Sequence, residues 1–372
     1  MRWKHVFDGL ILIALALAPF YLSAFNLSLL GRFLALAILS LGLVLVWGWG
    51  GILSLGQGIF FGLGAYVLAM HMTLVSIGPG GLPDFMMWSG LDNVPAWWSV
   101  FHSPALTLAC VVLLPMAAAA VLGWLIFHRR VGGVYFALIT QALALAFSTL
   151  LISEQAYTGG FNGLTNFTTI LGYSVNGPNF GRGLYWVTLG FLTLSFVLCQ
   201  WLRRTNFGKV LVAIRDGENR VRFLGYNAMA YKTVAFAVGG ALAGLAGALY
   251  MLHLGDISPA MVGVIPSIEM VVAVAVGGRE SLTGVILGTL LVNFGKDWVS
   301  NAIPQLWLFV MGALFVLVVT GMRGGLASLP QIFFRILHWR HRKVASGKGA
   351  LAIGGANPAR AVEEETETQK VV

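Results

Sequence analysis

The sequence predicts an all-α protein, a polytopic bundle of about eight to ten transmembrane helices with both termini in the cytoplasm. Hydrophobic residues make up 58% of the 372 residues and charged residues only 10%, and the mean hydropathy is +0.83. A soluble domain carries about 25% charged residues. The apolar residues occur in long runs, and about 20 such residues cross a bilayer. The basic residues gather on one set of connecting segments, as they do on cytoplasmic loops.

Ten apolar runs can be drawn along the chain, and each is a predicted span. The first follows a basic start without a small-residue cleavage site, so we expect a retained helix and not a signal peptide. The eighth and ninth are short. They are either full spans or a re-entrant pair around Gly277–Gly278, which is tolerated only inside protein; eight spans plus that pair is the alternative count. The runs are Gly9–Phe25, Leu30–Val46, Ile52–Ile77, Pro104–Phe127, Val134–Ser153, Leu184–Leu202, Thr233–Leu252, Ser267–Val276, Leu282–Phe294 and Leu306–Thr320.

The distribution of Lys and Arg predicts the orientation. With the N-terminus inside, 18 of the 23 basic residues fall on inner segments and three, Arg32, Arg182 and Lys296, fall outside. The remaining two, Arg360 and Lys370, lie in a basic-then-acidic tail, residues 331–372. We expect this tail to be a disordered cytoplasmic segment after a transmembrane domain of residues 1–330. This asymmetry predicts that both termini face the cytoplasm.

Residues 203–232 form a polar segment between two apolar runs, here called the basic segment. It reads RRTNFGKVLVAIRDGENRVRFLGYNAMAYK and holds seven Lys and Arg residues. Its apolar residues at Val210–Ile214 are more than a solvated linker needs. The alternative is that the seven basic residues only fix the membrane topology and contact lipid headgroups, which explains the charges but not the apolar residues. The pattern favours a short amphipathic helix at the cytoplasmic mouth that binds another chain.

Few polar residues lie within the predicted spans. An ionisable side chain at membrane depth is costly, so it is by default a functional hypothesis. We therefore treat five residues as candidates for a substrate path, with interhelical hydrogen bonding as the competing explanation: Gln57, Thr140, Gln141, Glu269 and Asn293. Small residues four apart, such as Gly240 and Gly244, predict close helix packing within one subunit.

Several classes of function are disfavoured. No phosphate-binding G-x-x-x-x-G-K-[ST] motif is present, because Gly208–Lys209 is followed by valine. We find no metal-ligand spacing, no catalytic constellation and no cofactor motif, and the positive charge is explained without nucleic acid. Cys110 and Cys199 lie in apolar runs and read as buried hydrophobes. A passive channel would not need the apolar part of the basic segment, and a secondary transporter would show inverted repeats and coupling-ion carboxylates. The pattern favours passage of a small neutral or zwitterionic solute, with energy supplied by another chain.

Several segments together resemble the membrane permeases of the branched-chain amino acid and urea class of ABC importers. They run in order between residues 30 and 326: GGILSLGQGIFFGLGAY, RRVGGVYFALITQAL, TGGFNGLT, the basic segment, YKTVAFAVGGALAGLAGALY, SIEMVVAVAVGGRESLTG and LFVMGALFVLVV. The loop WSGLDNVPAWW and the turn GGRESLTG are more similar to the urea type, although Glu280 and Met322–Arg323 depart from it. The resemblance implies urea or short amides as substrate, with a branched-chain amino acid as the alternative.

The resemblance also implies partners and a role for the basic segment. The chain would pair with a homologous second permease, two ATPase subunits and a periplasmic solute-binding protein in the inner membrane. The basic segment would be the ATPase-coupling helix, with no ATPase site of its own. Val210, Leu211 and Ile214 would anchor it in the ATPase groove, Arg215 and Asp216 would make polar contacts, and Gly208 and Gly217 would allow turns.

Overall fold

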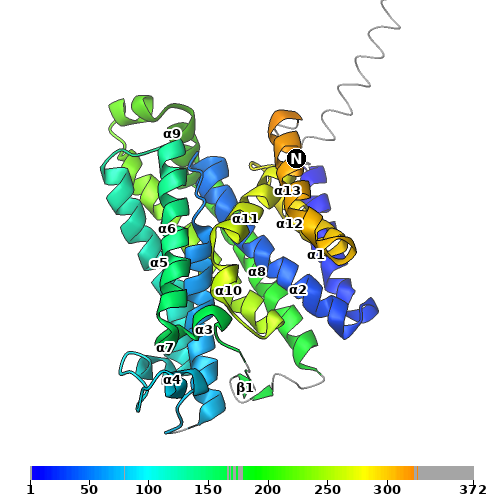
Figure 1. Cartoon of the computed structure of the whole chain (residues 1–372). Coiled ribbons are helices and arrows are strands. Elements are labelled where there is room, and N and C mark those ends of the chain that lie inside the picture. Colours follow the sequence, from blue (N-terminus) through cyan, green and yellow to red (C-terminus); the bar gives the residue numbers. More distant parts are fainter. Residues whose placement is uncertain are drawn as a thin grey trace, which may run out of the picture. The chain divides into compact units, whose positions relative to one another are not determined.

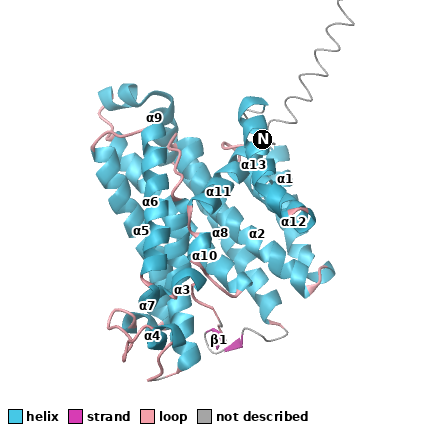
Figure 2. Ribbon diagram, viewed as in Figure 1, coloured by secondary structure: helices cyan, strands magenta, loops and turns pink. Residues whose placement is uncertain are grey.

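The computed structural model describes residues 2–321 and residue 325, except residues 79, 166, 168, 171–172 and 175–178. The described part is built almost entirely of helices (Figures 1 and 2), which confirms the predicted all-α fold. The sheet found there has two antiparallel strands of two residues each, β1 (Thr169–Ile170) and β2 (Tyr173–Ser174). The long helices are α1 (Arg2–Tyr21), α2 (Ala24–Leu43), α3 (Gln57–Ile77), α5 (Pro104–His128), α6 (Val134–Ser153), α8 (Phe180–Arg204), α9 (Asn206–Phe223), α10 (Ala228–Leu254), α11 (Val264–Gly277), α12 (Leu282–Ala302) and α13 (Trp307–Gly321).

Ten of these helices coincide with the ten apolar runs. Seven helices of the described part are long and apolar enough to cross a membrane, α2 with a π-helical extension at Val44–Trp49 among them, and α1 and α13 contain shorter apolar stretches. The two predicted domains divide at a position beyond the described residues, and the tail 331–372 also lies outside them.

The helix ends differ most from the predicted runs at α12. The run stops at Phe294, but the helix continues to Ala302. Lys296 and Asp297 lower the hydropathy there, yet they share one face of the helix with Thr289 and Asn293, at helical spacing. The helix therefore continues beyond the point at which this one face becomes polar.

The centre of the bundle is formed by α2, α3 and α10. α10 packs against α2, α3 and α5, and α2 also packs against α8 and α12. Of the span residues, 83% are buried in both α2 and α3, but only 22% in α5 and 28% in α6. α5 and α6 expose large apolar side chains such as Leu113, Trp124 and Leu145. A large exposed apolar surface of this kind is typical of contact with membrane lipid.

Glycines allow the central helices to approach closely. A Cβ atom on Gly64 of α3 would overlap the backbone of Gly244 in α10, and one on Gly247 of α10 would overlap the carbonyl of Phe61 in α3. On another face of α10, a Cβ on Gly240 would crowd Ala119 of α5. These contacts lie within one chain, which supports the predicted role of the small residues in intrachain packing.

The helices place α9 and the longer loops at opposite ends of the described bundle. Figure 1 shows α9 at one end, and the short helices α4 (Asp84–Trp88) and α7 (Gln155–Thr158) at the other with β1. α9 contacts α8, α10 and the π-helical end of α2. The basic segment is thus held against three of the membrane helices.

Candidate functional site

The structure corrects the predicted direction of the apolar face of α9. Leu211 is fully buried in the main core of the chain, and Ile214 is 2% exposed in a small cluster with Val221 and Ala228. Val210 packs against the same small cluster and is half-buried. The expected anchors therefore face the chain's own helices, because an amphipathic pattern shows that one face is covered but not which protein covers it.

The two glycines of α9 have different roles. Gly217 forms a kink within the helix, with φ −174° and ψ 72°. Gly208 does not form a turn: it lies within the helix, and an added Cβ would overlap the carbonyl of Leu202 at the end of α8. Its missing side chain lets α9 pack tightly against the end of α8.

Arg215 connects α9 to two other elements. Its Nη1 donates to the carbonyl of Gly48, 2.6 Å away, and to Oε1 of Glu280 at 2.9 Å. Its Nε donates to Asp216 Oδ1 at 2.9 Å. Gly48 lies in the π-helical end of α2, and Glu280 lies in the turn between α11 and α12. The Arg215 side chain is 23% exposed and Asp216 is 64% exposed, so Arg215 contacts its own chain while Asp216 faces outward.

A second ion-pair group fixes α9 to α10. Glu218 accepts from Lys232 of α10 at 2.5 Å and from Arg222 at 2.6 Å. Burial alone would raise the pKa of Glu218, but these two cations lower it below its usual value. Glu218 therefore stays ionised at neutral pH and keeps both partners.

The exposed apolar residues of the basic segment lie at the end of α9. Phe223 is 91% exposed, Leu224 76% and Tyr226 45%. They follow Arg220, which is also exposed, closely in the chain. Their exposure makes them, rather than Leu211 and Ile214, available to another protein.

A cavity of about 380 Å³ lies among α2, α10, α11, α12 and α13. Three helices contribute residues at helical spacing along one face each, so the cavity runs beside them for several turns. Because Glu280, just before α12, contacts α9, the cavity beside the second half of α12 lies away from α9. Its lining comprises Leu29, Arg32, Phe33, Leu36, Ser40, Phe61, Tyr250, Ser258, Ala260, Met261, Pro266, Glu269, Met270, Ala273, Thr289, Val292, Asn293, Lys296, Asp297, Ser300, Trp307 and Met311.

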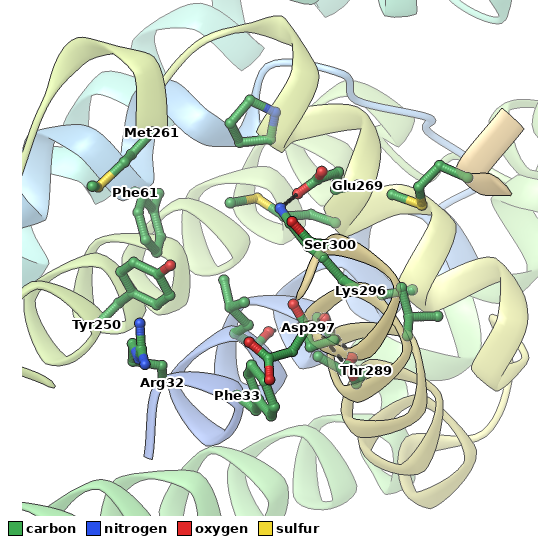
Figure 3. A pocket seen from close by; sticks show the side chains of 18 of the residues that line it. Arg32, Phe33, Phe61, Tyr250, Met261, Glu269, Thr289, Lys296, Asp297 and Ser300 are labelled. Atoms are coloured by element: carbon green, nitrogen blue, oxygen red, sulfur yellow. Dashed lines mark hydrogen bonds and ion pairs between the residues drawn. The ribbon is translucent and has the colours of Figure 1, made fainter. Parts of the chain in front are cut away.

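Two of the predicted path residues line this cavity. Glu269 accepts from Lys296 Nζ at 2.5 Å and from Trp307 Nε1 at 2.9 Å, so its charge is paired and it joins α11, α12 and α13. Asn293 donates to the carbonyl of Thr289 at 2.7 Å. Figure 3 shows Glu269 and Lys296 together on one side of the cavity, with Arg32 and Tyr250 on the opposite side.

Two charged residues of the lining make no ion pair within the described part of the chain, although Arg32 interacts electrostatically with the carboxyl of Asp256. Arg32 makes no hydrogen bond or ion pair among the residues that the structure describes, and its Nε atom is buried. Asp297 accepts only a long 3.4 Å hydrogen bond from Asn301 within the same part of the chain. An unpaired charge in a partly buried site is costly, so each of them marks a place for a ligand or another chain.

At the end of the cavity nearest α9, the lining contains a hydrogen bond between two helices. Thr289 of α12 donates to Ser40 of α2 at 2.9 Å, and both side chains are 1% exposed. Ser40 in turn donates to the carbonyl of Leu36. The cavity thus has a polar floor where α2 meets α12.

The other three predicted path residues lie elsewhere. Thr140 of α6 accepts from the backbone N–H of Leu55 at 3.1 Å, which fixes the segment before α3. Gln57 begins α3 and is 1% exposed, with no partner for its Nε2 among the described residues. Gln141 is half-buried on α6. None of these three lines the cavity.

From the sequence, Arg32 and Lys296 are recognisable only as topology charges, and Asp297 does not stand out. A signal was present, since the polar residues Thr289, Asn293, Lys296 and Ser300 recur at helical spacing. That pattern indicates a wet face on an otherwise apolar helix. Nothing in the sequence alone placed Arg32 of α2 opposite this face.

The apolar bundle, its paired and unpaired buried charges and the amphipathic α9 define a membrane transport protein. Residues 25–319 match the family model described as branched-chain amino acid transport system / permease component. The chain therefore belongs to this permease family, whose match extends from α2 into α13, and it is a protein of the inner membrane.

Several curated relatives are similar over most of their length. The high-affinity branched-chain amino acid transport system permease protein LivM of Escherichia coli strain K12 is 26% identical over 86% of this chain and 75% of its own. LivH of the same strain, with the same description, is 23% identical over 80% of this chain and 92% of its own. The probable branched-chain amino acid transport permease protein LivM of Methanocaldococcus jannaschii is 27% identical over 68% of this chain and 75% of its own. No solved structure matches. These descriptions give no support to the expected urea specificity.

Proposed function

We propose that this chain is a permease subunit of an ATP-driven importer of branched-chain amino acids. The observation that carries the proposal is the family match over residues 25–319, which covers α9 and all of the cavity lining. The cavity supports an amino acid over urea. Urea is neutral and has no charge with which to pair Arg32 or Asp297, whereas an amino acid has two.

The chain would work with a second permease, two ATPase subunits and a substrate-binding protein. Similarity to both LivM and LivH of one strain supports a pair of related permeases. The exposed end of α9, Phe223, Leu224 and Tyr226, is the surface we assign to the ATPase subunit, since an apolar cluster can anchor a helix in a groove. This assignment replaces the buried residues Leu211 and Ile214.

The internal contacts of α9 supply a mechanism for coupling. A movement of α9 would pull on Gly48 and Glu280 through Arg215. These residues belong to the ends of α2 and of the α11–α12 pair, and the same helices line the cavity. A shift of α2 against α12 would break the Ser40–Thr289 contact and open the cavity floor.

Uptake by the complete assembly tests the proposal. The chain, the permease, ATPase and binding-protein partners encoded with it, and ATP would be combined in proteoliposomes. We expect saturable, ATP-dependent uptake of L-leucine and little uptake of urea or short amides. ATP-driven urea uptake without leucine uptake would contradict the substrate, and flux through this chain alone without ATP would contradict the class.

A further inference from the structure

The cavity combines two opposite charges that do not pair with each other and a largely apolar wall. Arg32 lies on α2 and Asp297 on α12, and no ion pair joins them. Leu29, Phe33 and Val292 of the same two helices also line the cavity, as do Met261 and Met270. A ligand that satisfies both charges at once needs one anionic and one cationic group close together.

The total charge of the lining is zero. Arg32 and Lys296 are cationic, and Glu269 and Asp297 are anionic. Lys296 and Glu269 neutralise each other at 2.5 Å, which leaves Arg32 and Asp297 as one lining charge of each sign outside any ion pair. A solute with a net charge would leave one of these unpaired in a partly buried site, which is unfavourable. A zwitterion leaves neither.

We infer that this cavity is a binding site for an α-amino acid, in which Arg32 binds the carboxylate and Asp297 binds the ammonium group. This rests on the proposed function and extends it, because it assigns the substrate's two charges to named residues of the permease itself. A guanidinium can donate two parallel hydrogen bonds to a carboxylate. The apolar wall of Phe33, Val292 and Met270 then accepts an aliphatic side chain, and about 380 Å³ is a suitable volume for a small ligand.

Ligand-induced stabilisation of the full chain in nanodiscs tests the inference without any partner protein. A ligand that binds the folded state raises the melting temperature. We expect L-leucine to raise it, whereas 4-methylpentanoate, which lacks the ammonium group, and 3-methylbutylamine, which lacks the carboxylate, bind about tenfold more weakly or worse. These comparisons use the unaltered chain and so do not depend on the folding of a variant.

Variants then assign the two charges. Arg32→Gln and Asp297→Asn should each weaken L-leucine binding by about tenfold or more, because each leaves one ligand charge unpaired. Arg32→Lys keeps the cation and should retain part of the response. Arg182→Gln removes an exposed arginine of α8 that does not line the cavity, and it should bind L-leucine normally.

Three outcomes would overturn the inference. They are the absence of any response of the unaltered chain to L-leucine, equal responses to L-leucine and its two half-analogues, and unchanged binding in Arg32→Gln and Asp297→Asn. Loss of co-purified anionic phospholipid in Arg32→Gln, with an unchanged response to leucine, would show instead that Arg32 binds a lipid phosphate.

ATP-driven uptake separates this inference from the proposed function. Normal leucine uptake by an assembly that carries Arg32→Gln or Asp297→Asn would contradict the site and leave the importer function standing. Failure of the unaltered assembly to take up any branched-chain amino acid would contradict the function itself.

Discussion

Arg215 and Arg32 show how neighbours decide the role of one residue type. Arg215 has three oxygen acceptors within 3 Å, on Gly48, Asp216 and Glu280. Arg32 lies against a cavity and has no acceptor among the described residues. The first arrangement joins elements of the chain, and the second leaves donors free for a ligand.

Replacing Arg215 should weaken coupling more than stability. Arg215→Gln removes the charge-assisted bonds to Glu280 and Asp216, and the partly exposed site limits the loss of stability to about 1 kcal/mol. We expect ATP hydrolysis by the assembly to persist while the ratio of leucine transported to ATP hydrolysed falls severalfold. Arg220→Gln, on the exposed side of α9, is the control. An unchanged ratio in Arg215→Gln would refute the coupling role.

The sequence predicted some residue roles and not others, for physical reasons. Glu269 and Asn293 were found because polar groups at membrane depth are conspicuous, and both line the cavity. Arg32 was missed because the cavity that it lines is completed by α11 and α12, more than 200 residues away in the chain. Thr140 and Gln57 are also polar residues within predicted spans, yet Thr140 binds the backbone of Leu55. The sequence alone cannot distinguish a polar residue with such a structural contact from one that lines a substrate path.

At the scale of helices, close packing depends on backbone contact between α3 and α10. Gly64, Gly244 and Gly247 bring the two helices together without intervening side chains. In lipid, such van der Waals contact replaces the hydrophobic driving force that water would supply.

Gly64→Ala should therefore destabilise the bundle. Its methyl group would overlap the backbone of Gly244, which cannot move aside as a side chain can. Overpacking of this kind costs about 1–3 kcal/mol. The measurement is the apparent melting temperature of the purified chain in detergent. Gly190→Ala, on α8 where no neighbouring element lies within 4 Å, should melt at or above the temperature of the unaltered chain; equal melting of both variants would disprove the packing argument.

The apolar end of α9 should determine binding to the ATPase subunit. Phe223→Ser with Leu224→Ser removes two highly exposed apolar side chains, so the fold should be retained while co-purification of the ATPase falls by about tenfold or more. Trp88→Ser, on the exposed surface of α4 at the opposite end, is the control. Undiminished co-purification would show that the ATPase binds elsewhere.

The prediction of the helices from hydropathy succeeded where an apolar run and a helix have the same bounds, and it failed where the helix extends beyond the apolar run. The apolar runs located ten helices, but the run at Leu282–Phe294 ended before α12 did because Lys296 and Asp297 face a cavity. The amphipathic pattern of α9 was also detected, but its apolar side was assigned to a partner. Periodicity indicates a buried face, and only the fold shows what buries it.

At the scale of the whole molecule, the described bundle connects α9 with a cavity on the far half of α12. α2, α11 and α12 extend between the two regions, with Arg215 at one end and the Ser40–Thr289 contact in the cavity lining. Such a contact between two helices is a suitable element for alternating access, because a small relative shift of the helices breaks it.

A cross-link at the cavity floor tests most directly whether this cavity is the substrate path and opens during ATP-driven transport. The hydroxyls of Ser40 and Thr289 are 2.9 Å apart, so Ser40→Cys with Thr289→Cys places two thiols in contact. In the complete assembly, we expect oxidation to abolish ATP-driven leucine uptake and a reductant to restore it, while each single variant is unaffected. Full uptake with the disulfide demonstrated by mass spectrometry would contradict this account.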